Sequence, residues 1–259
     1  MVDIGKSNPV DFLLRPELLP TIWCSGCGIG IVVNSFVQAV EKIRGDSKEV
    51  RVLSTGIGCT GKISDYLDIE SCCVTGGEVV NWVAKLTSES PDARVVLFLD
   101  DADFIASGVG PFFQAGARGA ELLIIYINNY IYRLFMEYRV SEKTSCDEHS
   151  ADRTFESPFN IPNLAKVCGA RYIARWTPLH PRRLMHSITD GLQKRGFSVV
   201  EVISPCLMTF PSIGKIGETI DRMGFYREHS VIKHNEPTEN LDIRSQQRII
   251  VGEFGCRSF

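Results

Sequence analysis

The feature of this sequence that most constrains its fold is a set of nearly continuous apolar runs of strand length. Three such runs cover residues 94–99, 121–127 and 198–203. A strand with one wet face alternates apolar and polar residues, whereas a strand buried on both faces of a parallel sheet gives an unbroken apolar run. Segments with helical spacing separate these runs, for example the one carrying Leu184, Ile188 and Leu192. This alternation predicts an α/β protein with a doubly wound, mainly parallel sheet.

Size and composition limit the organisation and the classes of ligand. A chain of 259 residues with 44% hydrophobic and 23% charged residues is an ordinary globular protein near the upper limit for a single core. We expect one large domain over residues 1–207 and a C-terminal extension over residues 208–259 that contacts a partner. The net charge of -3 gives no reason to expect binding of nucleic acid or an anionic membrane. With no signal-peptide pattern and no run of roughly 18 apolar residues, a cytoplasmic location is predicted.

Two cysteines, Cys24 and Cys27, lie in the stretch WCSGCG directly before an amphipathic run. Apolar residues at helical spacing over residues 32–43 predict a helix there, so the thiols sit at its amino end. Backbone N–H groups at that end favour thiolate over thiol. The pair is compatible with a redox-active disulfide, with two ligands of a zinc or iron-sulfur site, and with two buried structural cysteines.

Several polar residues follow the carboxyl ends of predicted strands, where open α/β sheets place their ligands. They are Cys59, Asp101, Asn129 and Cys206. Together with Cys24 and Cys27, the two thiols of this group complete a four-cysteine set that suits an iron-sulfur cluster. The carboxylate and amide oxygens suit Mg²⁺ that carries a diphosphate.

These motifs, in this order, resemble those of the β subunits of 2-oxoacid:ferredoxin oxidoreductases, and the 2-oxoglutarate-type enzymes are the nearest. The resemblance runs from about residue 14 to residue 206. It rests on IWCSGCG at 22–28, GIGC at 56–59, DDAD at 100–103 with NNYIY at 128–132, and GFSVVEV at 196–202 followed by SPC at 204–206. Each motif alone is weak, but four in order at fitting separations are specific.

The resemblance implies a thiamine-diphosphate-binding fold with three bound groups. Cys24, Cys27, Cys59 and Cys206 would hold a 4Fe-4S cluster, and Asp101, Asn129 and the main-chain carbonyl of Ile131 would ligate Mg²⁺. Residues close to thiamine diphosphate would be Ile57, Gly58, Cys59, Thr60, Gly76, Ala102, Asp103, Arg133 and Leu134.

The resemblance also implies an activity and partners. Such enzymes oxidatively decarboxylate a 2-oxoacid to an acyl-CoA, with coenzyme A as acceptor, and pass electrons through the cluster to ferredoxin. The implied partners are an α subunit and, where present, a γ subunit. The carboxylate that activates the cofactor comes from a partner subunit in this family, so no catalytic side chain is assigned to this chain.

The sequence departs from the family's pattern around the cofactor. Asp100 replaces a glycine, and the stretch TGGE at residues 75–78 replaces Thr-His-Gly-Arg, which exchanges a cation for Glu78. One interpretation is that the chain still binds thiamine diphosphate, with Arg133 supplying the lost charge. Another is a non-catalytic iron-sulfur paralogue, for electron transfer or assembly, that has lost the cofactor. A third is a small dithiol oxidoreductase that uses Cys24 and Cys27.

Overall fold

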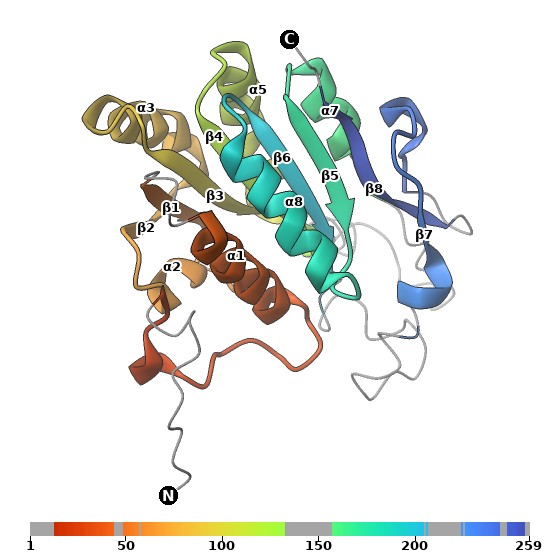
Figure 1. Cartoon of the computed structure of the whole chain (residues 1–259), viewed down its shortest axis with the longest axis horizontal. Helices are drawn as coiled ribbons and strands as arrows, with labels where there is room; N and C mark the ends of the chain where they lie inside the picture. Colours follow the sequence, from red (N-terminus) through yellow and green to blue (C-terminus); the bar gives the residue numbers. More distant parts are fainter. Residues whose placement is uncertain are drawn as a thin grey trace, which may run out of the picture.

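A computed structural model of the chain describes residues 13–43, 49–56, 58–132, 157–204, 206, 224, 226–243 and 248–256. Within these ranges an eight-stranded sheet has the order β2-β1-β3-β4-β6-β5-β8-β7 (Figure 1). The strands are β1 (Val50–Thr55), β2 (Ser71–Val74), β3 (Arg94–Asp100), β4 (Leu122–Asn128), β5 (Tyr172–Trp176), β6 (Ser198–Ile203), β7 (Ser230–Ile232) and β8 (Ile249–Cys256). Every pair is parallel except β5 with β8, so the predicted mainly parallel sheet is confirmed.

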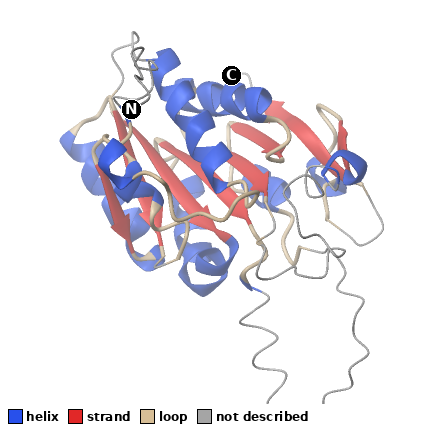
Figure 2. Cartoon of the chain, turned by 90° about the horizontal axis from the view of Figure 1, so that it is seen from below, coloured by secondary structure: helices blue, strands red, loops and turns tan. Residues whose placement is uncertain are grey.

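Helices cover both faces of this sheet, as Figures 1 and 2 show. The longer helices are α1 (Ile29–Ile43), α3 (Val79–Glu89), α5 (Val109–Ala117), α7 (Ile161–Val167) and α8 (Pro181–Gln193). Apolar residues of α1 and α8 join one core cluster, and those of α3, α5 and α7 join a second. The central strands β3, β4 and β6 are buried at every position because both of their faces are covered. No helix in the described ranges is both long and apolar enough to cross a membrane.

Short helical turns mark the loops that carry the predicted site. They are η2 (Pro16–Leu18), α2 (Ile63–Tyr66), η4 (Gly76–Glu78), α4 (Asp101–Asp103), the π-helix η5 (Phe104–Gly108) and η6 (Thr238–Asn240). The acidic motif DDAD at residues 100–103 does not form a loop. Asp100 instead caps a helix, since its side chain accepts a hydrogen bond from the backbone N–H of Asp103 at 2.9 Å. From Asp101 the chain then continues through η5 into α5.

The C-terminal strand is part of this chain's own sheet. β8 pairs antiparallel with β5, and β7 pairs parallel with β8 at the sheet edge. β8 therefore adds to the sheet of its own chain. The division at residue 207 and the partner contact of the extension stay predictions.

Candidate functional site

The sheet order reverses between β1 and β3, because the chain passes from β1 to β2 on one side and then returns to β3 on the other. Open α/β sheets bind ligands outside the carboxyl ends of the strands at such a reversal. The loop after β1 and the helix start after β3 meet here. Gly56 has a φ of +85°, and a Cβ at this position would collide with the carboxylate of Asp103. Glycine at residue 56 therefore allows the close approach of the two segments.

Four residues form what we call the acidic edge, at the ends of β3 and β4: Asp100, Asp101, Asp103 and Asn129. Asp101 is only 2% exposed. Burial first, and then the charge of Asp100, raise the pKa of Asp101 to about 8. Burial raises the pKa of Asp100 to about 6, and it raises the pKa of Asp103 as well. The ionised form of this edge is thus unfavourable by itself.

The oxygens of Asp101 are the strongest indication of a cation in the acidic edge. Backbone N–H groups of Tyr132 and Ala102 lower its pKa in part. Among the described residues, however, no donor reaches either oxygen with the geometry of a hydrogen bond. A buried carboxylate is costly unless it is paired or coordinates a metal. A divalent cation bound to Asp101 would remove that cost, so the residues present fit the predicted magnesium ion.

The turn after β4 holds the other two predicted magnesium ligands. Tyr130 is fully buried and has a φ of +60°, a conformation that is costly for a side chain with a Cβ. The backbone N–H of Ile131 donates to Oδ1 of Asn129 at 3.2 Å. The strained turn therefore lies between Asn129 and Ile131, at the site that the resemblance assigns to the metal.

The predicted cofactor residues are only partly described. Gly58, Cys59 and Thr60 lie in the loop after β1, with Gly58 exposed and Thr60 buried. Ala102 lies in α4, and the turn η4, which begins at Gly76, contacts η5. Ile57, Arg133 and Leu134 lie outside the described residues. The contact of these residues with a cofactor stays a prediction.

Two of the carboxylates that depart from the family's pattern have structural roles. Asp100 caps α4, as described above. The hydroxyl of Thr75 donates to Oε2 of Glu78 at 3.0 Å, and the N–H of Glu78 donates to the carbonyl of Thr75 at 2.9 Å. An acidic side chain at this place also complements the positive amino end of α3. The departures thus stabilise helix starts and leave Asp101 and Asn129 in place.

The first two thiols lie in a tight turn before α1. The N–H of Cys27 donates to the carbonyl of Cys24 at 3.1 Å, and Gly28 has a φ of +88°. A Cβ on Gly28 would collide with Ser204 and Pro178. The turn therefore packs directly against the segment that follows β6, which leads to Cys206.

Electrostatic coupling shows that the four predicted cluster thiols converge. Burial is the main cause that raises the pKa of Cys27, and the charges of Cys24, Cys59 and Cys206 raise it further. Burial also raises the pKa of Cys59, followed by the charges of Cys206 and Cys24. Such mutual effects require proximity. We call these four residues the thiol site.

The thiol site differs from the sequence prediction in two respects. The N–H of Ile29 does lower the pKa of Cys27, as expected at a helix start, but burial outweighs it and the thiol is favoured over the thiolate. In addition, no three His, Cys, Asp or Glu side chains in the described ranges are arranged to hold a metal ion. The thiols are neighbours without forming a closed ligand sphere, and both metal assignments stay predictions.

The thiol site and the acidic edge share a backbone contact. The N–H of Cys206 donates to the carbonyl of Asn129 at 2.8 Å, and the N–H of Ser204 donates to the carbonyl of Asn128 at 2.9 Å. The hydroxyl of Ser204 in turn donates to the carbonyl of Cys27. One short segment after β6 thus joins the end of β4 to the first cysteine turn.

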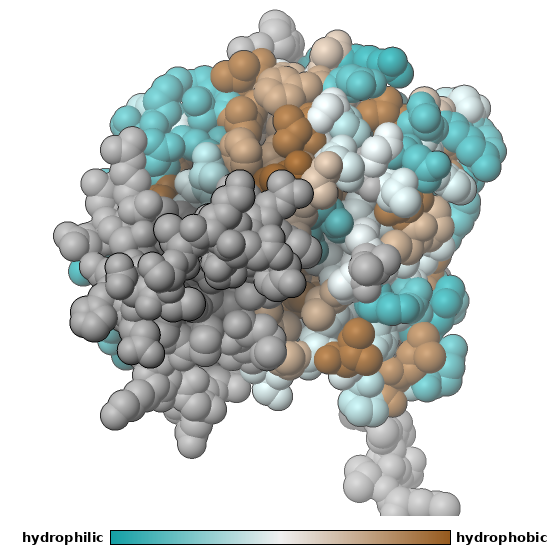
Figure 3. Space-filling model, turned by 180° about the vertical axis from the view of Figure 1, so that it is seen from behind, coloured by the Kyte–Doolittle hydropathy of each residue, from teal (hydrophilic) through white to brown (hydrophobic). Residues whose placement is uncertain are grey.

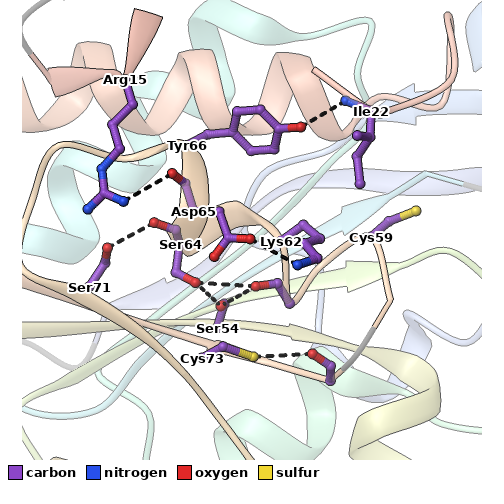
Figure 4. A network of polar contacts seen from close by, with 12 residues as sticks. Arg15, Ile22, Ser54, Cys59, Lys62, Ser64, Asp65, Tyr66, Ser71 and Cys73 are labelled. Atoms are coloured by element: carbon purple, nitrogen blue, oxygen red, sulfur yellow. Dashed lines mark hydrogen bonds and ion pairs between the residues drawn. The ribbon is translucent and has the colours of Figure 1, made fainter. Parts of the chain in front are cut away.

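Sequence reasoning missed two structural supports of the site. Tyr66, on α2, accepts a hydrogen bond from the N–H of Ile22 at 3.0 Å (Figure 4), and nothing in the local sequence marks it. Arg175 and Glu201 form a fully buried ion pair at 2.6 Å, and Glu201 also accepts from Asn128 at 2.9 Å. The sequence signal for this pair was an Arg and a Glu, of opposite charge, each within an apolar run of strand length.

Comparisons with known proteins identify the family of this chain. A family model described as "Thiamine pyrophosphate enzyme, C-terminal TPP binding domain" matches residues 75–202, which include the acidic edge. The 2-oxoglutarate synthase subunit KorB of Methanothermobacter thermautotrophicus is 34% identical over 259 residues, covering 97% of this chain and 88% of the relative. KorB of Methanocaldococcus jannaschii is also 34% identical, over 95% of this chain and 92% of the relative. The chain belongs to the β-subunit family of 2-oxoacid:ferredoxin oxidoreductases.

More distant members of this β-subunit family agree. The 2-oxoacid:ferredoxin oxidoreductase subunit beta of Saccharolobus solfataricus is 28% identical, over 71% of this chain and 61% of the relative. Among solved structures, the 2-oxoglutarate:ferredoxin oxidoreductase of Magnetococcus marinus matches with a TM-score of 0.73 at 20% identity, over 98% of this chain and 87% of that one. That protein was solved with 2-oxoglutarate, coenzyme A and succinyl-CoA bound. Its match to this β subunit concerns the fold.

Proposed function

We propose that this chain is the β subunit of a 2-oxoacid:ferredoxin oxidoreductase that converts a 2-oxoacid to an acyl-CoA in the cytoplasm. Asp101, Asn129 and the carbonyl of Ile131 would hold Mg²⁺ and, through it, the diphosphate of thiamine diphosphate. The thiol site would hold a 4Fe-4S cluster. When bound, the cofactor supplies the decarboxylation chemistry and the cluster accepts single electrons for ferredoxin.

The hydrogen bond between the N–H of Cys206 and the carbonyl of Asn129 is the observation that carries this proposal. An enzyme of this class needs its cofactor and its electron acceptor within a short distance. Here a predicted cluster ligand and a predicted metal ligand touch through their backbones. The buried carboxylate of Asp101, whose oxygens lack a well-formed hydrogen bond among the described residues, would balance the charge of the cation that carries the diphosphate.

Surface features support the proposed α subunit as a partner. An apolar groove of about 200 Å³ lies between α3 and α5. Ile105 in η5 and Phe113 in α5 have exposed apolar side chains. Figure 3 shows apolar residues among polar ones on the back face of the molecule. Exposed apolar surface of this kind marks sites of protein association. The partner would supply the carboxylate that activates the cofactor, and ferredoxin would take the electrons.

The other two interpretations receive less support. In the cofactor-free paralogue, Asp101 would remain buried without a cation, which is costly. A dithiol oxidoreductase would use only Cys24 and Cys27, and it leaves the approach of Cys59 and Cys206 to this turn unexplained.

Calorimetric titration with thiamine diphosphate and Mg²⁺, on the chain purified with its partner subunit, tests the proposal. We expect Mg²⁺-dependent binding at one site per chain. Asp101→Asn should abolish that binding, and Asp92→Asn, at an exposed position, should leave it unchanged. Absence of binding to the unmodified complex would refute the catalytic proposal and favour the cofactor-free paralogue.

A further inference from the structure

Two aromatic side chains join the segments that carry three of the four thiols. The indole Nε1–H of Trp23, next to Cys24, donates to the carbonyl of Cys59 at 3.0 Å. The ring of Trp23 packs on that of Tyr66, with centroids 4.8 Å apart and planes tilted by 50°. The hydroxyl of Tyr66 accepts from the N–H of Ile22 at 3.0 Å. The first cysteine turn is thus attached to the Cys59 loop from two directions.

Tyr66 is itself held firmly, so it can act as an anchor. It is 6% exposed on α2. Its carbonyl accepts from the N–H of Arg15 at 3.0 Å, and the N–H of Asp68 donates to the carbonyl of Leu13 at 2.9 Å. The guanidinium of Arg15 also donates to the carbonyl of Asp65 (Figure 4). The N-terminal segment and α2 therefore form one unit.

The Cys59 loop is attached to the same unit from the side of the sheet. The hydroxyl of Ser54, near the end of β1, donates to the carbonyl of Gly61 at 2.8 Å and lies 3.0 Å from the hydroxyl of Ser64. A Cβ on Gly61 would collide with the carbonyl of Gly56, so the loop closes tightly. The peptide of Cys59 lies within this loop, and its carbonyl accepts the hydrogen bond from Trp23.

We propose that Trp23 and Tyr66 are positioning residues that fix the peptide of Cys59 against the turn of Cys24 and Cys27, and so set the retention and the reduction potential of a cluster bound at the thiol site. This inference rests on the proposed function. The hydrogen bonds of both side chains are made with backbone atoms. Their effect passes through the backbone, in the way that outer-shell partners orient metal ligands.

A conservative variant series tests the proposal on the full chain, purified anaerobically with its partner subunit. Trp23→Phe keeps an aromatic ring and removes the N–H donor, and Tyr66→Phe removes the acceptor for Ile22. Trp82→Phe is the matched control, because Trp82 is half-buried on α3 and packs in the other core cluster. Iron and acid-labile sulfide per chain, the rate of cluster bleaching in air, and the midpoint potential are measured for each.

We expect Trp23→Phe to bleach about 10-fold faster, at the lower end of the roughly 10- to 100-fold cost of losing an outer-shell partner, and to show a shifted midpoint potential. Tyr66→Phe should show a smaller change in the same direction, and Trp82→Phe should match the unmodified chain. A shift in potential separates positioning from a general loss of stability, which circular dichroism melting monitors.

Two outcomes would overturn the proposal, and they are distinguishable. An unmodified complex without iron would refute the cluster in the proposed function and this inference with it. A loaded unmodified complex whose Trp23→Phe and Tyr66→Phe variants behave like Trp82→Phe would refute this inference alone. If Trp23→Phe does not fold, the comparison of Tyr66→Phe with Trp82→Phe decides in the same way.

Discussion

The acidic edge and the thiol site are neighbours, but the chain positions them by different means. Asp101 and Asn129 directly follow adjacent parallel strands, whose ladder pairs Asp100 with Ile127. The thiol site draws its residues from two loops and a segment after β6, and individual hydrogen bonds from Trp23 and Ser204 hold them together. A strand ladder fixes its ends through many bonds at once, whereas a loop site depends on each contact separately.

The two regions also differ in how they tolerate the loss of a metal. Thiols become neutral by keeping their protons, and burial favours that form in Cys27 and Cys59. The acidic edge keeps three carboxylates in a fixed, mostly buried place, and its only relief is to take up protons or a cation. Without a metal, the carboxylates of the acidic edge therefore carry an electrostatic cost. The protonated thiols of the thiol site carry a smaller one.

The largest predicted effect is that one substitution in each region removes only the group that binds in that region. Cys206→Ser should reduce the iron content from about four atoms per chain to none, because the cluster needs four thiolates. The same variant should keep thiamine diphosphate binding, since the backbone N–H that reaches Asn129 is unchanged. Asp101→Asn should abolish cofactor binding and keep the iron. Iron assay and calorimetry on both variants measure this.

Cys168→Ser is the control for the cysteine variant, since Cys168 is a half-buried free thiol at the end of α7. It should change neither quantity. If Cys206→Ser and Asp101→Asn each lose both iron and thiamine diphosphate, the two regions form one site and the distinction between them is wrong.

The next largest effect is a pH dependence of the metal-free chain. Asp101 has a pKa of about 8 in the fold against 3.8 as its ordinary value, so folding takes up a proton between these values. The unfolding free energy should therefore fall as the pH rises from about 4 to about 8. At about 1.4 kcal/mol per pKa unit, the total change is on the order of 5 kcal/mol.

Urea unfolding at several pH values checks this slope. Asp101→Asn should reduce it to the smaller slope that Asp100 and Asp103 contribute. Saturation with Mg²⁺ and thiamine diphosphate should also reduce it, because a cation stabilises the carboxylate. Asp92→Asn should leave the slope as it is. A slope that Asp101→Asn does not alter would mean that the buried carboxylate is already satisfied.

A smaller effect is expected from the ion pair beneath the acidic edge. Glu201→Gln would leave the fully buried guanidinium of Arg175 without its counter-charge and should cost about 3–5 kcal/mol of unfolding free energy. Glu239→Gln breaks an exposed pair with Lys166 and should cause no measurable change. If Glu201→Gln and Glu239→Gln lower the unfolding free energy by the same amount, the inference that the strands beneath the acidic edge are the rigid part is wrong.

The sequence predicted those parts of the fold that repeated patterns encode. The apolar runs gave β3, β4 and β6, and the helical spacing gave α1 and α8, each within a few residues. The same logic placed Asp101 and Asn129 at one edge of the sheet, because parallel strands end together. The short strand β2 was missed: it has four residues, with three of them at least partly exposed, and lacks an apolar run.

What the sequence could not show depends on contacts between distant segments. Tyr66 lies in a single helical turn of four residues, too short to leave a periodic pattern. The cap that Asp100 forms on α4 and the place of Glu78 at the amino end of α3 were interpreted as losses at a cofactor site, because these helix starts are visible only in the structure. The burial of Cys27, which reverses the expected effect of the helix start, likewise depends on packing against the segment after β6.

The bond between Cys206 and Asn129 has a consequence for electron flow. From the loop that would carry the diphosphate to the sulfur of Cys206 there is one hydrogen bond and a few covalent bonds. Asn129 would hold the cation that carries the diphosphate and Cys206 would hold the cluster, so this main-chain contact would keep the cofactor close to its electron acceptor. Because this contact joins two backbone atoms, substitution of either side chain would leave it in place.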